Sequence, residues 1–171
     1  MTEHSERLAF AYKRLAASAE VLSAATEEFT KPIAELDEAL NRLDLGLNTW
    51  QKVSGGGDDD TADWWQRDVG YARIGRKWGL AIRKLNGNHR YPQEDRSEQW
   101  LFGEAPRSYR IEALDKLPDL LEELIKNSDK TAKKLKEKAV EANELAVALK
   151  SAADEVRQEK DQAKQQKKER R

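Results

Sequence analysis

The feature that most constrains this chain is an unbroken 4–3 spacing of mostly apolar residues along its first fifty positions. Such spacing forms the seam of a coiled coil or of a long bundle helix. The seam consists of Leu8, Tyr12, Leu15, Ala19, Leu22, Thr26, Phe29, Ile33, Leu36, Leu40, Leu43, Leu47 and Trp50. Because it keeps its phase through Pro32, we expect one coiled-coil helix over residues 1–50 with a bend at Pro32.

A second seam runs through the last third of the chain. Its members are Leu117, Leu121, Leu124, Ser128, Thr131 and Leu135, then, after one 4–4 step, Ala139, Ala142, Ala146, Leu149, Ala153 and Val156. The extra residue in that step is a stutter, which unwinds a supercoil locally. We expect a second coiled-coil helix over residues 105–160 with a bend near Pro118, followed by a basic, frayed tail over residues 161–171.

Glycine separates these arms from the segment between them, because eight of the nine glycines fall between Gly55 and Gly103. Residues 51–104 therefore form a distinct head rich in glycine and tryptophan, with a flexible Gly-Asp loop over residues 54–63. Strand-like runs at 69–74 and 78–85 flank a turn at 75–77, and residues 99–102 read as a third strand. The dipeptide at 86–87, Asn-Gly, predicts a reversal between the second and third strands.

Neither arm can bury its seam alone, and the simplest solution folds the two arms back on each other. The sequence thus predicts a mainly α protein with a small antiparallel β insert. In it, two long antiparallel coiled-coil helices are capped by a three-stranded β head. This layout of two long helices with β-hairpins at their bend is similar to that of a prefoldin subunit. The resemblance implies a client-holding chaperone whose clients bind near residues 1–15 and 140–160.

Composition narrows the classes of function. The 171 residues carry a net charge of −1, which gives the whole molecule no bulk attraction to nucleic acid or anionic membrane. Cysteine is absent, which removes disulfides, thiolate metal sites and a cysteine nucleophile and favours a reducing compartment. No apolar run is long enough for a membrane span, and the first residues do not resemble a signal peptide. We expect a cytoplasmic protein.

The sequence offers no catalytic constellation. Its two histidines, His4 and His89, have no neighbouring residue that suggests acid–base work. The aspartates of the 58–63 segment lack the alternating spacing of a calcium loop, so they read as a solvated loop rather than a metal site. We therefore expect no enzyme activity, no cofactor and no metal.

The strongest candidates for recognition lie in the head, where residues 64–91 hold seven basic residues and one acidic residue among aromatic side chains. The candidate partner-binding residues are Trp65, Arg73, Arg76, Lys77, Trp78 and Arg83. Tryptophan and arginine dominate many protein interfaces, although a small head also needs tryptophan for its own core. Aromatic and guanidinium groups on a sheet can also stack on bases and hold phosphates.

Two main hypotheses of function follow, beside the chaperone role that the resemblance implies and a small enzyme whose site the sequence does not show. The first is a non-enzymatic protein-interaction or scaffold (adaptor) protein that engages a protein partner, or a second copy of itself, through its helical arms or its tryptophan-rich head. The alternative is a nucleic-acid-binding module that uses the basic aromatic hairpin, with an affinity that falls steeply as salt rises.

Overall fold

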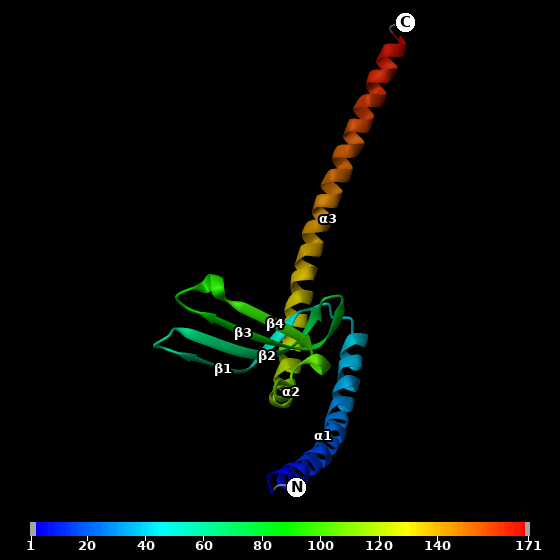
Figure 1. Ribbon diagram of the computed structural model, residues 1–171. Coiled ribbons are helices and arrows are strands. Elements are labelled where there is room, and N and C mark those ends of the chain that lie inside the picture. Colours follow the sequence, from blue (N-terminus) through cyan, green and yellow to red (C-terminus); the bar gives the residue numbers. More distant parts are fainter. Residues whose placement is uncertain (1–2, 170–171) are drawn as a thin grey trace. The chain divides into compact units, whose positions relative to one another are not determined.

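The computed structural model describes the backbone of residues 3–169 and the side chains of residues 3–166. It divides into two compact units, Met1–Ile125 and Lys126–Arg171. The first unit contains a β-sheet and the helices packed on it, and the second consists of helix alone (Figure 1). A mainly helical chain with an antiparallel sheet was predicted, and this much is confirmed.

Three α-helices account for most of the residues that the structure describes. Helix α1 spans Glu3–Arg42 and contains Pro32, α2 spans Arg107–Leu114, and α3 spans Leu117–Glu169. Helix α1 continues through its proline and curves along its length (Figure 1). Proline removes one backbone hydrogen bond, which permits such a curve. Where we expected a single second arm from residue 105, α2 and α3 are separate helices.

The first arm ends eight residues earlier than predicted. Asp44 and Gly46 both have positive φ, at 47° and 62°, a conformation in which a helix terminates. The residues that follow, including Trp50 at the end of the predicted seam, belong to the first strand instead. The tail expected over 161–171 is helical up to Glu169, and its last two residues lie outside the described part.

The sheet has four strands where the sequence predicted three. They are β1 (Thr49–Asp58), β2 (Asp63–Ile74), β3 (Lys77–Asn88) and β4 (Arg96–Leu101), joined as an antiparallel meander. The predicted hairpin around Gly75 is present as β2 and β3. The predicted reversal at 86–87 is wrong, because those residues lie inside β3 and the chain reverses over 89–95. That connection contains the short helix η1 (Pro92–Glu94), and η2 (Phe102–Glu104) follows β4.

The additional strand is the glycine run that we expected to be a flexible loop. Gly55, Gly56 and Gly57 pair with β2 as part of β1. A Cβ on Gly56 would lie 3.1 Å from the Trp65 indole nitrogen, and one on Gly57 would lie 3.0 Å from the Asp63 carbonyl oxygen. These glycines therefore allow close packing within the sheet rather than freedom of the backbone.

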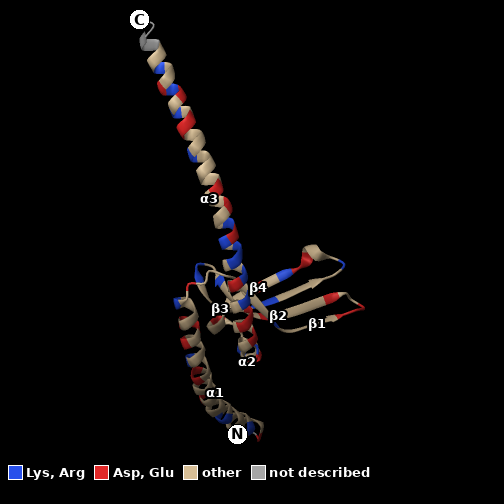
Figure 2. Cartoon of the chain, turned by 180° about the vertical axis from the view of Figure 1, so that it is seen from behind, with Lys and Arg blue, Asp and Glu red and all other residues tan. Residues whose placement is uncertain are grey.

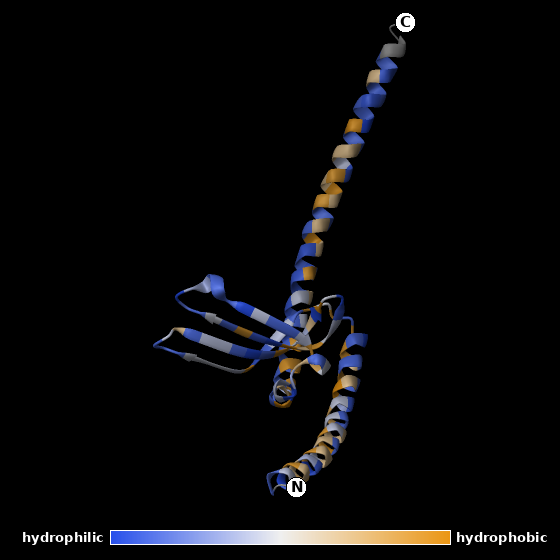
Figure 3. Ribbon diagram, in the orientation of Figure 1, coloured by the Kyte–Doolittle hydropathy of each residue, from blue (hydrophilic) through white to orange (hydrophobic). Residues whose placement is uncertain are grey.

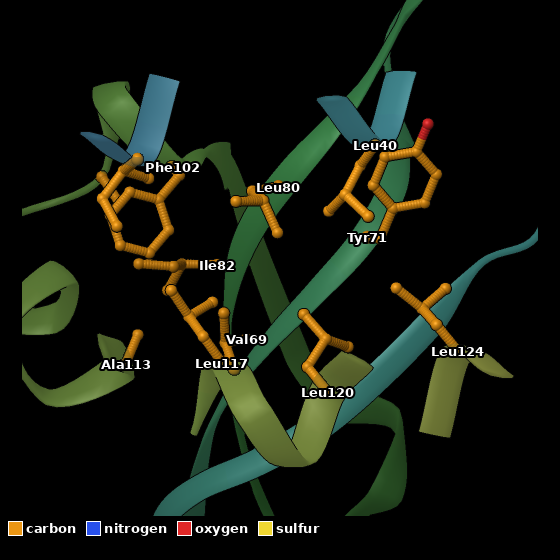
Figure 4. Close-up of a cluster of buried hydrophobic side chains, with 12 residues drawn as sticks. Leu40, Val69, Tyr71, Leu80, Ile82, Phe102, Ala113, Leu117, Leu120 and Leu124 are labelled. Atoms are coloured by element: carbon orange, nitrogen blue, oxygen red, sulfur yellow. The ribbon is translucent and has the colours of Figure 1, made fainter. Parts of the chain in front are cut away.

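One face of the sheet carries the core. By strand alternation, Val69 and Tyr71 of β2 share a face with Leu80 and Ile82 of β3, and all four are fully buried. Side chains of the three helices complete this cluster (Figure 4). They are Ile33 and Leu40 of α1, Ala113 of α2, and Leu117, Leu120 and Leu124 of α3.

Within the first unit, α1 packs on the sheet-centred core and not along a second arm, which differs from the predicted two-helix pairing. The seam of α1 is buried only between Phe29 and Leu40, where it contacts the sheet-centred core. Residues 3–25 of α1 are all exposed. Among the described residues, no helix is long and apolar enough to cross a membrane.

The opposite face of the sheet is built from small residues beneath one large ring. Gly70 lies under the Trp50 indole, and a Cβ there would collide with that ring and with the Thr49 carbonyl oxygen. Its neighbours Ala72 and Ala81 are buried on the same face. The indole thus covers this face of the sheet at Gly70.

We predict that Gly70→Ala lowers the free energy of unfolding by about 1–3 kcal/mol, because the added methyl group overpacks the Trp50 contact. Gly103→Ala is the matched control, since nothing lies within 4 Å of a Cβ at that position. It should change stability by less than about 0.5 kcal/mol. Urea unfolding measures both, and equal stability of the two variants would refute the packing described for Gly70.

Candidate functional site

The six candidate residues do not form one site. Arg73, Arg76, Lys77 and Trp78 surround the β2–β3 turn, Trp65 lies toward the other end of β2, and Arg83 lies on the face sealed by Trp50. Of the first group, Lys77 and Trp78 line a cleft. We call that cleft the turn cleft, and it belongs entirely to the first unit.

The turn cleft has a volume of about 530 Å³ between the end of α1 and the β2–β3 turn. Its lining residues are Asp37, Asn41, Asp44, Gly46, Tyr71, Lys77, Trp78 and Leu101. The Trp78 ring stacks on the Tyr71 ring, with centroids 5.7 Å apart and an interplanar angle of 22°. The buried Tyr71 hydroxyl donates a hydrogen bond to Asn41 Oδ1 over 2.9 Å. One wall is therefore aromatic and rigidly held.

Asp37 fastens α1 to the sheet at this cleft. Its Oδ1 accepts a hydrogen bond from the Leu80 backbone nitrogen over 2.5 Å, and its carboxylate lies against Gly79. Burial raises the pKa of Asp37 above its ordinary value of 3.8, and the bond from Leu80 opposes that rise. Burial also raises the pKa of Tyr71, as do the negative charges of Asp37 and Asp44.

Each of these shifted groups is already engaged in holding the fold. Asp37 satisfies a backbone donor at the start of β3, and Tyr71 bridges the sheet to α1. The exposed Lys77 lines the cleft, and the exposed Arg73 and Arg76 belong to the same β2–β3 hairpin. The turn cleft can thus offer an indole surface and mixed charges to a partner's side chain.

We predict opposite effects for two substitutions of Asp37. Asp37→Ala leaves the Leu80 N–H without its acceptor and should lower the free energy of unfolding by about 1–3 kcal/mol. Asp37→Asn keeps an acceptor oxygen and removes the buried charge, so at neutral pH it should be at least as stable as the wild type.

The difference in stability between Asp37→Asn and the wild type should depend on pH, because the pKa of Asp37 is raised in the folded protein. A carboxyl group whose pKa is higher when folded binds its proton more tightly in the folded state, so the wild type gains stability as pH falls through the folded pKa. The advantage of Asp37→Asn should therefore shrink from neutral pH toward 3.8, as measured by thermal unfolding. An advantage that grows over this range would contradict the assignment.

Trp65 belongs to a cation–aromatic stack that attaches α2 to the sheet. The Arg67 guanidinium lies 4.8 Å from the Trp65 ring centroid and 4.6 Å from that of Tyr109. Its Nη1 is also 2.9 Å from both carboxylate oxygens of Glu112. Arg67, one of the seven basic residues of the 64–91 segment, is thus neutralised within the fold. Trp65 itself remains partly exposed.

Arg83 forms the other structural ion pair. Its Nε donates to Oδ2 of Asp68 over 2.6 Å, while Gln66 Nε2 donates to Oδ1 of the same carboxylate over 2.6 Å. The guanidinium lies 4.4 Å above the Trp50 ring. Because the Asp68 side chain is buried, its charge requires this partner, which places Arg83 in the framework rather than on a binding surface.

We predict that Arg83→Ala lowers the free energy of unfolding by about 2–4 kcal/mol, since it leaves the Asp68 carboxylate buried and without its cation. The same substitution at Arg73, an exposed side chain on the same sheet, should cost less than about 0.5 kcal/mol. Chemical unfolding of the pair distinguishes the two roles. Equal losses would show that Arg83 is not a framework residue.

A second cleft, of about 720 Å³, lies at the end of the sheet opposite the turn cleft. Its lining residues are Asp63, Trp64, Asn86, Gly87, Asn88, Gln93, Glu94, Asp95 and Arg96. The acidic residues of the neighbouring 58–63 segment mark the tip of β1 (red in Figure 2). Hydrogen bonds from Asn88 and Thr61 lower the pKa of Asp63. Across the described side chains, no group of three or more histidine, cysteine, aspartate or glutamate residues is placed to hold a metal ion.

Several of the residues that organise these sites were missed at the sequence level. Asp37 looks like an ordinary surface charge in the sequence, and Arg67 looks like part of a basic recognition surface; only the fold brings each to its partner. Asp68 did carry a signal, as the single acidic residue among the basic residues of 64–91. An isolated acid in a basic strand pair indicates a buried counter-ion.

Comparisons with protein-family models, with curated proteins and with solved structures found no match. A function is therefore inferred from the chain's own residues.

Proposed function

We propose that this chain is a non-enzymatic protein-interaction or scaffold protein that binds its partners through its helical arms. The observation that carries the proposal is the exposure of apolar seams along α1 and α3. Figure 3 shows apolar bands recurring along both helices. Large side chains stand in them at high exposure, including Leu15 at 67% and Leu149 at 74%.

An amphipathic helix in water gains most of its stability from a surface that covers its apolar stripe. In the second unit, residues 132–166 are all exposed. Their seam combines large side chains at Leu135, Leu149 and Val156 with alanines between them. Alanine permits close approach of another helix, so an amphipathic partner helix is the occupant that fits this stripe best.

The charges of the head favour the arms over the head as the binding element. Arg67 and Arg83 are neutralised by Glu112 and Asp68. Arg90 donates to the Asp60 carbonyl oxygen over 3.3 Å. Fewer cations are thus left to contact a phosphate backbone than the sequence suggested, which supports the protein-interaction hypothesis ahead of the nucleic-acid alternative.

The titrating groups support a non-enzymatic role in the same way. Among the described residues, Asp37, Tyr71 and Asp63 have clearly shifted pKa values. Each is explained by burial or by hydrogen bonds that secure neighbouring elements.

We expect Leu149→Glu to abolish capture of partner proteins, because the charge falls on the seam of α3. Ser151→Glu is the matched control, since it adds the same charge two residues away on the other side of the same exposed helix. Quantitative affinity capture from native cells compares both variants with the wild type, and circular dichroism confirms equal helix content.

Partner proteins that the Leu149→Glu variant still captures would contradict a role for this arm. The head is tested separately by Arg73→Glu and Arg76→Glu, which reverse charge around the β2–β3 turn without changing either seam. Loss of partners in these variants alone would move the interaction to the head.

A further inference from the structure

The first half of α1 has its charges confined to one narrow stripe. Between residues 5 and 28 the charged residues are Glu6, Arg7, Lys13, Arg14, Glu20, Glu27 and Glu28. All of them fall at two adjacent positions of a seven-residue repeat, and they therefore line one side of the helix. We call this the charged stripe. Every other residue in the segment is uncharged.

The remaining circumference is a broad apolar face. Its centre is the seam through Leu8, Tyr12, Leu15, Ala19 and Leu22, of which Leu8 is 72% and Leu22 48% exposed. In a simple coiled-coil pair, charged residues flank the seam and select the partner. Here alanine and serine flank it on both sides, at positions 9, 11, 16, 18, 23 and 25.

This face is large enough for a stable interface. A large side chain can bury roughly 150–200 Å², so the exposed parts of the large residues offer on the order of 500 Å². The flanking alanines and serines raise this toward the roughly 800 Å² that each partner contributes to a standard interface. A second helix laid along residues 5–28 would therefore bury what a specific dimer requires.

The sizes of the seam residues select the orientation. Leucines occupy one set of seam positions (Leu8, Leu15, Leu22), and Tyr12, Ala19 and Thr26 occupy the other. Two copies placed parallel would set leucine against leucine and alanine against alanine, whereas an antiparallel pair sets each leucine of one copy beside a residue of the other set. The charged stripe lies on the side of the helix away from the seam, so it stays in water in the pair.

We propose that α1 pairs antiparallel with α1 of a second copy of this chain, with the two helices crossing near Ala17. This inference rests on the proposed function and names the partner of one arm. A two-fold register follows from the seam: Leu8 faces Thr26, Tyr12 faces Leu22, and Leu15 faces Ala19, each pair occurring twice. Two of the three layers combine a large residue with a smaller one, which suits close packing.

The fold leaves this pairing unobstructed within the first unit. The buried part of α1 starts only at Phe29, where its side chain packs beside Phe102 with ring centroids 6.4 Å apart. Residues 3–25 precede that anchor and are exposed throughout. In an antiparallel dimer the two sheets stand at opposite ends of the paired segment, beyond residue 28 of each copy.

The oligomeric state of the full chain tests the proposal directly. Sedimentation equilibrium at micromolar concentration should show a dimer for the wild type. Leu22→Glu should raise the dissociation constant by roughly tenfold or more, because it puts a charge in the seam. Val21→Glu is the matched control: it introduces the same charge one residue earlier, in the charged stripe, at a side chain that is 71% exposed. It should remain dimeric.

Orientation is tested by disulfide formation, since the natural chain contains no cysteine. The double variant Leu8→Cys with Thr26→Cys should form a covalent dimer under mild oxidation, because the antiparallel register brings these positions together. Leu8→Cys alone should not crosslink. A covalent dimer from the single variant would establish a parallel pair and overturn the proposed arrangement.

A monomeric wild type would overturn self-association, whether α1 is then covered by the chain's own second unit or by a different protein. That failure is distinguishable from failure of the proposed function. Capture of partners through α3, tested by Leu149→Glu, does not depend on α1 pairing. A monomer that still loses its partners on Leu149→Glu would refute the α1 dimer and leave the arm function in place.

Discussion

The structure depends on one apolar face of a four-stranded sheet. Val69, Tyr71, Leu80 and Ile82 are fully buried there, and each such side chain contributes about 1.5–3 kcal/mol when removed from water. Three helices meet on this face, and each gives it only a short segment (Figure 4). Because the sheet is small, it can hold only part of each long helix. The exposed lengths of α1 and α3 follow from that limit.

The other face of the sheet explains why the head is a poorer binding surface than its composition suggests. There Trp50 lies over Gly70, and the guanidinium of Arg83, which pairs with Asp68, lies over the Trp50 ring. On the core face, Arg67 is held between two aromatic rings and an acid. Aromatic and basic residues that resemble a recognition surface in the sequence are thus used to join strands and helices.

The sequence predicted where the helices lie along the chain better than it predicted what packs against them. A 4–3 spacing shows which side of α1 is apolar, but it cannot say what covers that side. Ile33 and Leu40 are covered by the sheet-centred core, whereas Leu8 and Leu15 of the same seam are exposed. The seam also continued in phase to Trp50, although the helix ends at Arg42. Positive φ at Asp44 and Gly46 interrupts the helix where the pattern does not.

The fourth strand escaped prediction for a related reason. A run of glycines reads as a flexible loop because composition does not reveal close approach. Position 56 has little room for a side chain because the Trp65 indole lies against Gly56. That contact exists only once β1 and β2 are paired. Of the candidate site, the four residues around the β2–β3 turn were placed together by their spacing. Asp37, which completes the turn cleft from α1, is about forty residues away in sequence and could not be linked to them.

The central claim is that the sheet fixes the middle of the chain while the helical arms are stabilised by association. Hydrogen–deuterium exchange at two protein concentrations tests it most directly, because exchange reports the local free energy of opening. The account predicts slow exchange in residues 67–83 at both concentrations. It predicts fast exchange in residues 5–28 of the dilute protein, slowing as concentration rises and α1 pairs. Protection of residues 5–28 that is already complete in a dilute monomer, and unchanged on concentration, would contradict it.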